Sequence, residues 1–359
     1  MAEIKYLNKH HPLYQEDLVN VLSIPGIEEL KGKSLLITGA SGLIGVCLID
    51  ALMLYNTQDA GITIYAVGRS KEKAFSRLGE YYNSNYFHFI EQDVRQPLPR
   101  NVNPDYIIPL ASNTHPLAYS QYPIETIEIN VKGAEYALKT AQSCGATILY
   151  PSTVEVYGNA RGEDVFTEDY TGKLNLSNAR SCYTESKRVC EALCQSYIAE
   201  KGVEVKIVRL SRVFGPTMLM SDSKASSQFV QKALKGEDIV LKSKGEQYFS
   251  YTYVADAVAA MLYVLLHGEK GVSYNISNKK CDVHLKDFAH CCADAVGTNV
   301  VFDLPSEVEM KGFSVAMNAI LCTDKLTELG FKPFYTFNDA ISRTIKILGR
   351  YDGNDSSRD

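Results

Sequence analysis

The sequence lacks the features that mark membrane, secreted and nucleic-acid-binding proteins. No apolar run approaches the roughly 20 residues that a membrane-spanning helix needs. The N-terminus lacks the charged and then apolar layout of a secretory signal. Lysine and arginine are spread evenly and the formal net charge is −5, so no basic stripe is available for nucleic acid or an anionic membrane. We therefore expect neither nucleic acid nor a membrane as a partner.

The cysteines and histidines form no pattern that predicts a metal site or a disulfide framework. Nine cysteines are scattered without a Cys-x-x-Cys pair, and the seven histidines form no ligand cluster. Cys190 and Cys194 lie four residues apart in a helical stretch, a spacing that suits buried, small apolar side chains. These absences predict a reducing, cytoplasmic location and no bound metal.

What the chain does have is a glycine-rich turn after its first expected strand. A short apolar run begins after Lys33 and ends in glycines at positions 39, 42 and 45, and an apolar segment of helical composition follows. Gly39 permits a tight turn, Gly42 leaves room for a pyrophosphate near the backbone, and Gly45 lets the helix pack closely on the strand. The first N–H groups of that helix are then available to an anion. This arrangement predicts a dinucleotide-binding site.

Further apolar runs of strand length follow the turn and alternate with helical patterns. They cover 62–67, 87–93, 105–112 and 146–150, and a strand is also expected near 272–276. A long helical pattern covers 123–144. Alternation of strand and helix specifies a parallel sheet with helices on both faces. We therefore predict an α/β fold, a doubly wound Rossmann-type sheet with a smaller C-terminal substrate domain.

The end of the second expected strand bears on the choice between the two nicotinamide dinucleotides. A carboxylate at this position binds the ribose 2′-hydroxyl of NAD, whereas an arginine accommodates the 2′-phosphate of NADP. The chain has Arg69 here, followed by Ser70 and Lys71, and no acid. We predict that NADP(H) is favoured. NAD(H) stays possible, because Arg69 can instead be a solvated loop residue above a cofactor held mainly by backbone.

Two motifs downstream combine residues that suit proton and hydride transfer. Ser152 and Thr153 stand at the carboxyl end of the fifth expected strand, the edge at which open α/β sheets bind ligands. Tyr183 and Lys187 are four residues apart, so on a helix they share one face. A lysine cation there favours phenolate and lowers the pKa of the tyrosine, as an acid-base catalyst at an alcohol or ketone needs.

These motifs, in this order, resemble the extended short-chain dehydrogenase/reductases, the NAD(P)-dependent nucleotide-sugar epimerase/dehydratase family. The resemblance runs from Lys33 to Leu348. The matching stretches are 38–45, 110–112, 130–133, 151–158, 183–187, 209–216 and 253–256. Within the family, segments 123–127, 152–158 and 181–188 are most similar to UDP-glucuronate decarboxylases.

The resemblance implies hydride exchange between a nicotinamide and a sugar carbon. Thr153 would hydrogen-bond the reacting oxygen, Tyr183 would move its proton, and Lys187 would hold the nicotinamide ribose. Glu155 would either abstract a proton beside a keto group or only hydrogen-bond sugar hydroxyls. The residues expected at the cofactor are Gly39, Ser41, Gly42, Leu43, Ile44, Gly45, Arg69, Asp93, Val94, Leu110, Ala111, Ser112, Tyr183 and Lys187. Those expected at the substrate are Arg212, Ser227, Gln228 and Phe249.

Three positions depart from the family pattern. Val154 stands where decarboxylases and many dehydratases carry Ser or Asp, and it cannot donate or accept a proton. The substrate-binding arginine of the family, which in the decarboxylases is associated with removal of the carboxylate, falls on Phe249. The family asparagine near the expected strand end is Arg212. Arg212 would either take over anion binding, since its fork suits phosphate, or pair with a nearby acid.

Two enzyme mechanisms and one non-enzymatic function fit the sequence. The losses at positions 154 and 249 and the basic Arg69 favour NADPH-dependent reduction of a nucleotide-linked ketose or keto-sugar, for which a CDP-linked alditol product fits. The alternative retains the hydride, as in a 4-epimerase, a 4,6-dehydratase or a UDP-glucuronate decarboxylase. A non-catalytic dinucleotide-binding sensor is the third candidate, although such a protein has no need of Thr153, Tyr183 and Lys187 together.

The expected organisation is two interleaved domains between an extension and a tail. The N-terminal extension covers 1–32, the NAD(P)-binding domain 33–214 and 250–280, the substrate domain 215–249 and 281–350, and the flexible tail 351–359. Helices at 123–144 and 183–200 would form a family-like four-helix homodimer. The expected partner is a nucleotide-linked sugar.

Overall fold

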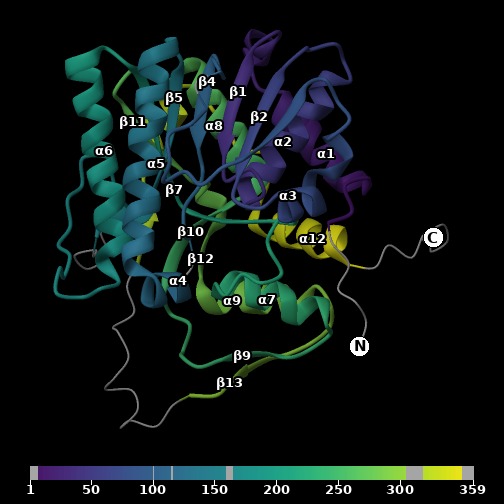
Figure 1. Cartoon of the computed structure of the whole chain (residues 1–359). Coiled ribbons are helices and arrows are strands. Elements are labelled where there is room, and N and C mark those ends of the chain that lie inside the picture. Colours follow the sequence, from purple (N-terminus) through teal and green to yellow (C-terminus); the bar gives the residue numbers. More distant parts are fainter. Residues whose placement is uncertain (1–6, 100, 115, 159–164, 305–317, 350–359) are drawn as a thin grey trace.

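The computed structural model of the chain is built around one parallel sheet of seven strands (Figure 1). It describes residues 7–99, 101–114, 116–158, 165–304 and 318–349. The strand order is β11-β7-β5-β4-β1-β2-β3, and every neighbouring pair is parallel. The strands are β1 (Ser34–Thr38), β2 (Thr63–Gly68), β3 (Phe87–Glu91), β4 (Tyr106–Pro109), β5 (Thr147–Thr153), β7 (Glu204–Leu210) and β11 (Ser273–Ile276).

Helices cover both faces of this sheet because its strands are apolar on both sides. In β1, Leu35 and Ile37 pack into a core with α2 (Leu43–Asn56) and α8 (Val254–His267). Leu36, which alternates with them, packs on the other face with α5 (Pro123–Cys144) and α6 (Ser181–Lys201). The doubly wound α/β fold predicted from the alternation of strand and helix is confirmed.

The predicted elements agree closely with those in the structure. The helix expected at 123–144 has these bounds, with Pro123 in its first turn and Gly145 in the left-handed conformation after it. The strand expected near 272–276 is β11, which pairs with β7 and so returns to the sheet. The tail at 351–359 lies outside the described residues, and the division into two domains stays a proposal.

The N-terminal helix α1 (Pro12–Leu22) packs against the sheet domain and the C-terminal helix α12 (Phe337–Leu348). It contacts α2, α8 and α12. Hydrogen bonds to two buried carboxylates, those of Asp50 and Asp17, connect α1 to these helices. The Tyr14 hydroxyl donates to Asp50 at 2.7 Å, and the Arg343 Nε donates to Asp17 at 2.8 Å.

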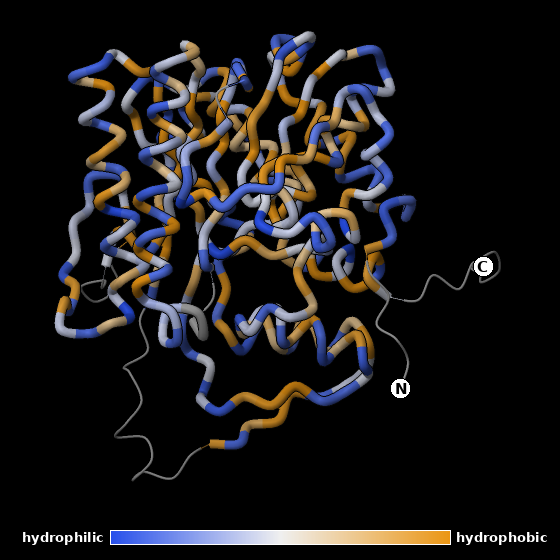
Figure 2. Tube along the Cα trace, in the orientation of Figure 1, coloured by the Kyte–Doolittle hydropathy of each residue, from blue (hydrophilic) through white to orange (hydrophobic). Residues whose placement is uncertain are grey.

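A smaller set of elements lies below the sheet in Figure 1 and completes the fold. Its three-stranded sheet has the order β12-β10-β8, and two strand pairs, β13-β9 and β14-β6, are also present. These strands are β6 (Val165–Phe166), β8 (Arg212–Phe214), β9 (Ile239–Leu241), β10 (Tyr248–Tyr253), β12 (Asp282–His284), β13 (Val300–Phe302) and β14 (Ile320–Leu321). In Figure 2 the β9-β13 pair is hydrophobic along most of its length.

The remaining helices are short. They are α3 (Lys71–Leu78), α4 (Pro116–Gln121), α7 (Ala225–Leu234), α9 (Leu285–Asp294) and α11 (Asp324–Glu328), with 3-10 turns η1 (Ile27–Leu30), η2 (Gly79–Tyr81), η3 (Val154–Tyr157) and η4 (Lys279–Cys281). Among the described residues, no helix is both long and apolar enough to cross a membrane. All nine cysteines are free thiols.

Candidate functional site

A cavity of about 1450 Å³ lies between the central sheet and the smaller part of the fold. It extends from the glycine turn after β1, past the carboxyl ends of β4 and β5, to β8 and β10. β1 lies between β2 and β4, so the chain winds away from β1 in opposite directions. Open α/β sheets bind their ligands at such a switch point.

The glycine turn has the shape that a pyrophosphate needs. Gly39 has φ +65°, and a Cβ there would lie 2.8 Å from the backbone nitrogen of Ala111. A Cβ at Gly45 would lie 2.7 Å from the carbonyl oxygen of Gly39, so only glycine allows α2 to approach β1 this closely. Gly42 precedes α2 without a capping side chain, and the turn lines the cavity. The N–H groups at the start of α2 therefore remain available to an anion.

Arg77 of α3 connects this turn by hydrogen bonds to the segment that follows β8. Its guanidinium donates to the carbonyl oxygen of Ser41 at 2.9 Å and also to the carbonyl oxygen of Thr217. The Thr217 hydroxyl donates to the carbonyl oxygen of Leu43 at 2.7 Å. Arg77 was not found from the sequence, because one arginine in a short amphipathic helix gives no indication of a distant partner.

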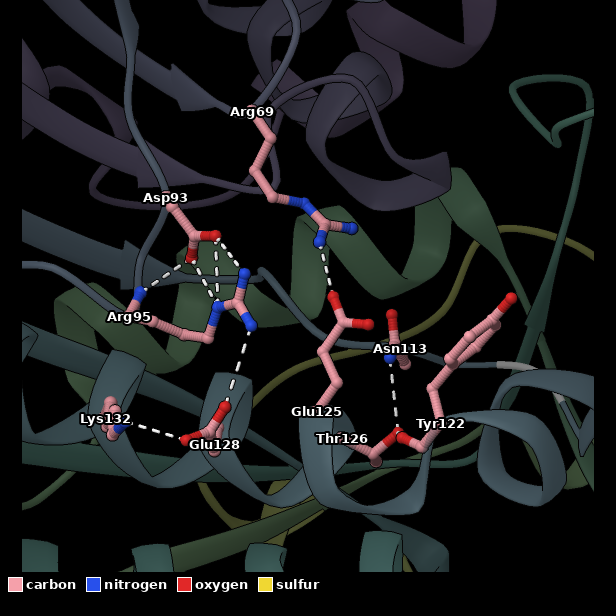
Figure 3. Close-up of polar contacts among 9 residues, drawn as sticks. All are labelled: Arg69, Asp93, Arg95, Asn113, Tyr122, Glu125, Thr126, Glu128 and Lys132. Atoms are coloured by element: carbon pink, nitrogen blue, oxygen red, sulfur yellow. Dashed lines mark hydrogen bonds and ion pairs between the residues drawn. The ribbon is translucent and has the colours of Figure 1, made fainter.

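Charged side chains beyond the ends of β2 and β3 meet side chains of α5 beside the cavity (Figure 3). Arg69 lies beyond the end of β2 and forms an ion pair of 2.7 Å with Glu125 of α5. Asp93, beyond β3, accepts hydrogen bonds from Arg95, which also faces Glu128 at 3.6 Å. Arg69 is thus neither a free phosphate receptor nor a residue that only contacts solvent.

Thr153 and Glu155 stand where β5 turns into η3. Thr153 is the last residue of β5, and its hydroxyl accepts a hydrogen bond of 3.3 Å from the backbone N–H of Glu155. The Thr184 hydroxyl donates to the Glu155 carboxylate at 3.3 Å. Val154, between them, is buried and belongs to an apolar cluster. Thr153, Val154 and Glu155 all line the cavity.

Tyr183 and Lys187 share one face of α6, as their spacing predicts, but they have different neighbours. The Tyr183 ring stacks on that of Tyr119 with a centroid separation of 4.7 Å, and both line the cavity. The Lys187 ammonium donates to the carbonyl oxygen of Pro151 at 2.8 Å and lies 5.0 Å from the centre of the Tyr150 ring. Tyr119 was not found from the sequence.

The electrostatics of Tyr183 differ from the sequence-based expectation. Burial and the charge of Glu155 raise its pKa, while hydrogen bonds with Thr153 and Tyr119 act in the opposite direction. Lys187 is not among the groups that shift the Tyr183 pKa, and burial lowers the pKa of Lys187 itself. The expected lowering of the tyrosine pKa by Lys187 is therefore absent in this arrangement, because the ammonium is directed to the carbonyl of Pro151.

Arg212 and Phe249 face each other across two paired strands. Arg212 opens β8 and pairs in register with Tyr251 of β10, two residues from Phe249. Its guanidinium carbon lies 3.7 Å from the centre of the Phe249 ring. The Arg212 Nη1 is buried without a hydrogen-bond partner among the described residues, and no described acid forms an ion pair with it. The pairing with an acid that the sequence left open is thus not found.

The cavity brings together most of the residues expected at the site. It is lined by Gly39, Ser41, Gly42, Leu43, Ile44, Gly45, Arg69, Val94, Leu110, Ala111, Ser112, Thr153, Glu155, Tyr183, Arg212 and Phe249. Asp93, Lys187, Ser227 and Gln228 do not line it. On α7, Ser226 lines the cavity instead, while the Gln228 amide donates to the carbonyl oxygen of Ser223. Among the described residues, no group of side chains could hold a metal ion.

Comparisons with known sequences identify a family and several relatives. Residues 35–277 match the model of the NAD dependent epimerase/dehydratase family. UDP-glucuronic acid decarboxylase 1 of Xenopus tropicalis is 32% identical over 283 residues, which are 79% of this chain and 65% of that protein. The chain thus spans about two thirds of this relative's length. UDP-glucuronic acid decarboxylase 1 of Danio rerio is 34% identical over 328 residues, 90% of this chain and 74% of that protein.

Comparisons with solved structures find the same fold. A dTDP-glucose 4,6-dehydratase from Bacillus anthracis, in complex with NAD, has a TM-score of 0.74 at 19% identity and covers 90% of this chain and 97% of its own. A UDP-glucuronic acid 4-epimerase from Bacillus cereus, in complex with UDP-glucuronic acid and NAD, has a TM-score of 0.73 at 18% identity, with coverages of 88% and 98%. At such low identity these likenesses concern the fold alone.

Proposed function

Since the chain belongs to the NAD-dependent epimerase/dehydratase family of enzymes, we propose that it modifies the sugar of a nucleotide sugar by hydride exchange with a nicotinamide cofactor that it retains between turnovers. Membership of this enzyme family confirms the resemblance drawn from the motifs and sets aside the non-catalytic sensor. The reaction itself, the substrate and the roles of individual residues are proposals.

The residues at the glycine turn fit a dinucleotide. Gly39, Gly42 and Gly45 leave no side chain between the backbone and a pyrophosphate, and the uncapped start of α2 offers N–H donors. When bound, the nicotinamide accepts a hydride from a sugar carbon and can return it. Thr153 would hydrogen-bond the reacting oxygen and Tyr183 would hold or release its proton. Lys187 would hold the nicotinamide ribose from the same helix as Tyr183.

The observation that carries the retained-cofactor proposal is the closure of the glycine turn by Arg77. This half-buried arginine joins the carbonyl oxygens of Ser41 and Thr217, so the segment after β8 is tied to the turn on which the pyrophosphate would lie. An enzyme that exchanges its cofactor at every turnover must open this contact each time. An enzyme that keeps its cofactor does not, and the closed arrangement suits it better.

NADPH-dependent reduction of a nucleotide-linked ketose or keto-sugar is the second candidate. It is favoured by Val154, which supplies no acid for a leaving group, and by Phe249, which supplies no charge. Simple carbonyl reduction needs neither group. The relatives described above are named as decarboxylases, epimerases and dehydratases, so none of their names adds support for the reductase.

An incubation without added reductant separates the two candidates. The purified enzyme is supplied with UDP-glucuronate, UDP-glucose or dTDP-glucose, and products are followed by mass spectrometry while the nicotinamide absorbance is recorded. We expect one of these sugars to be converted with no net absorbance change. If conversion of a keto-sugar instead requires added NADPH and consumes one equivalent per product, the enzyme is the reductase.

Three finer expectations stay predictions. NADP(H) preference rests on Arg69, whose charge is shared with Glu125. A homodimer formed through α5 and α6 agrees with the exposed Ile124, Ile127 and Val189 on these helices. A cytoplasmic location rests on composition.

A further inference from the structure

Arg212 differs from the other partly or fully buried arginines of the described chain. On β7, the strand that precedes β8 in sequence, Arg209 binds both oxygens of Glu191 and the carbonyl oxygen of Glu168. Arg343 binds Asp17, and Arg77 binds two backbone carbonyls. Arg212 has no comparable partner, and its Nη1 is buried without any hydrogen bond among the described residues.

The contact with Phe249 positions the Arg212 guanidinium but forms no hydrogen bond with it. The aromatic face attracts a guanidinium at 3.7 Å but occupies none of its N–H donors. Arg212 is half-buried, and a cation with a buried, unpaired donor is unfavourable unless an anion pairs with it. Since Arg212 lines the cavity, the missing anion can come from a ligand there. The Arg212 guanidinium is therefore available to bind a negatively charged group of a ligand.

The surroundings of Arg212 indicate which part of a nucleotide sugar would supply that charge. Leu210, two residues before Arg212, pairs in register with Thr153 of β5, and the charge of Glu155 acts on the pKa of both Arg212 and Tyr183. Arg212 therefore lies at the sugar end of the cavity, beside Thr153, Glu155 and Tyr183. The glycine turn follows β1, which β4 separates from β5 in the sheet.

We propose that Arg212 binds a carboxylate carried by the sugar, so that the substrates of this enzyme are nucleotide-linked hexuronates. The proposal rests on the proposed function, which places a nucleotide sugar in this cavity. A guanidinium suits the task because its fork can bind both oxygens of one carboxylate. Phe249 is then a positioning residue, since it supports the guanidinium without contacting the sugar carboxylate.

UDP-glucuronate and UDP-glucose test this inference because they differ at the carboxylate alone. Dissociation constants are measured by calorimetry with saturating cofactor, in the Tyr183→Phe background so that substrate is not consumed. We expect UDP-glucuronate to bind at least about tenfold more tightly than UDP-glucose, as one charge-assisted pair supplies. Arg212→Met should remove this preference while leaving the dissociation constant for UDP-glucose within about threefold. Arg212→Lys should retain part of it.

Two further variants test whether the preference for UDP-glucuronate depends on a cation at this place in the cavity. Lys279→Met removes an exposed cation outside the cavity, and it should leave the preference unchanged. The double variant Arg212→Asn/Phe249→Arg moves the cation to the neighbouring strand, and it should restore a preference for UDP-glucuronate. Thermal unfolding of each variant checks that it is folded.

Three results would overturn the inference. UDP-glucuronate fails to bind, Arg212→Met leaves the preference intact, or Arg212→Met weakens UDP-glucuronate, UDP-glucose and UDP equally. In the last case Arg212 binds the pyrophosphate. Because these measurements concern binding, the proposed function can fail in the turnover assay while the preference for a carboxylate stands, and the reverse also holds.

Discussion

Tyr183 is stacked on Tyr119, and the net effect of its surroundings favours the protonated form of its phenol. Burial and the charge of Glu155 raise its pKa, so the phenol keeps its proton at neutral pH in this arrangement. A protonated phenol beside Thr153 can donate to an oxygen that gains negative charge. Removing the proton for the reverse step needs a positive charge near the ring, and Lys187 is directed elsewhere, to Pro151.

Tyr183→Phe removes only the hydroxyl and keeps the stacked ring. If this hydroxyl moves the proton, turnover should fall by about a thousandfold while the dissociation constant for the cofactor changes little. Steady-state kinetics and fluorescence titration with NADH measure the two effects. Tyr119→Phe is the matched control, since it alters the neighbouring ring in the same way. A Tyr183→Phe enzyme within a few fold of the parent would show that another group handles the proton.

Charged side chains beyond the ends of β2 and β3 form ion pairs with the first turns of α5 (Figure 3). Glu125 neutralises Arg69, and Glu128, one turn later on the same helix, faces Lys132 and Arg95. A 2′-phosphate would have to compete with Glu125 for Arg69. The ion pair with Glu125 should therefore weaken the predicted preference for NADP(H).

Glu125→Gln should raise the affinity for NADP(H) relative to NAD(H) by about threefold to fivefold, since an exposed ion pair of this kind contributes little more. Glu128→Gln, on the same helix but paired with other cations, should leave the ratio unchanged. Fluorescence titrations with both reduced cofactors supply the ratio. An unchanged ratio in Glu125→Gln would mean that Arg69 does not face the 2′-position, and Arg69→Asp should then also have no effect.

At the scale of the whole molecule, the N-terminal helix α1 packs against the C-terminal helix α12. Arg343 of α12 donates to Asp17 and lies 2.8 Å from Glu16, both in α1, although the pairs are more than 300 residues apart in sequence. Asp17 is 1% exposed and also accepts a hydrogen bond from the Tyr253 hydroxyl. Burial raises the pKa of Asp17, and Arg343 and Tyr253 oppose that shift.

Arg343→Met should lower the free energy of unfolding by about 3 kcal/mol, the usual cost of leaving a buried charge without its partner. Without Arg343 the folded-state pKa of Asp17 rises further above its unfolded value. A carboxyl whose folded-state pKa is raised makes the folded state less stable as pH rises through that pKa, so the deficit should grow as pH rises above the usual range of a carboxyl. Urea unfolding at several pH values measures it, with Lys279→Met as an exposed-pair control. A deficit that shrinks as pH rises would contradict this account of Asp17.

Local patterns in the sequence determined the sheet, the glycine turn and the helix that carries Tyr183 and Lys187. Strand and helix periodicity depends on neighbours a few residues away, and so does the requirement for Gly39 and Gly45 in a tight strand-turn-helix unit. The bounds of α5 and the shared face of Tyr183 and Lys187 follow from the same local rules. These properties could therefore be predicted without knowledge of the rest of the chain.

Only the tertiary structure decided which partners the charged side chains meet. Arg77 reaches Thr217 across 140 residues of sequence, Arg69 reaches Glu125 across 56, and Arg212 reaches Phe249 on the paired strand. Such pairings depend on strand register and on how helices pack over the whole core, and no short pattern encodes them. For the same reason the sequence could identify Arg212 as unusual but could not say whether an acid pairs with it. The register of β8 on β10 decided that, by placing its guanidinium over an aromatic ring beside the cavity.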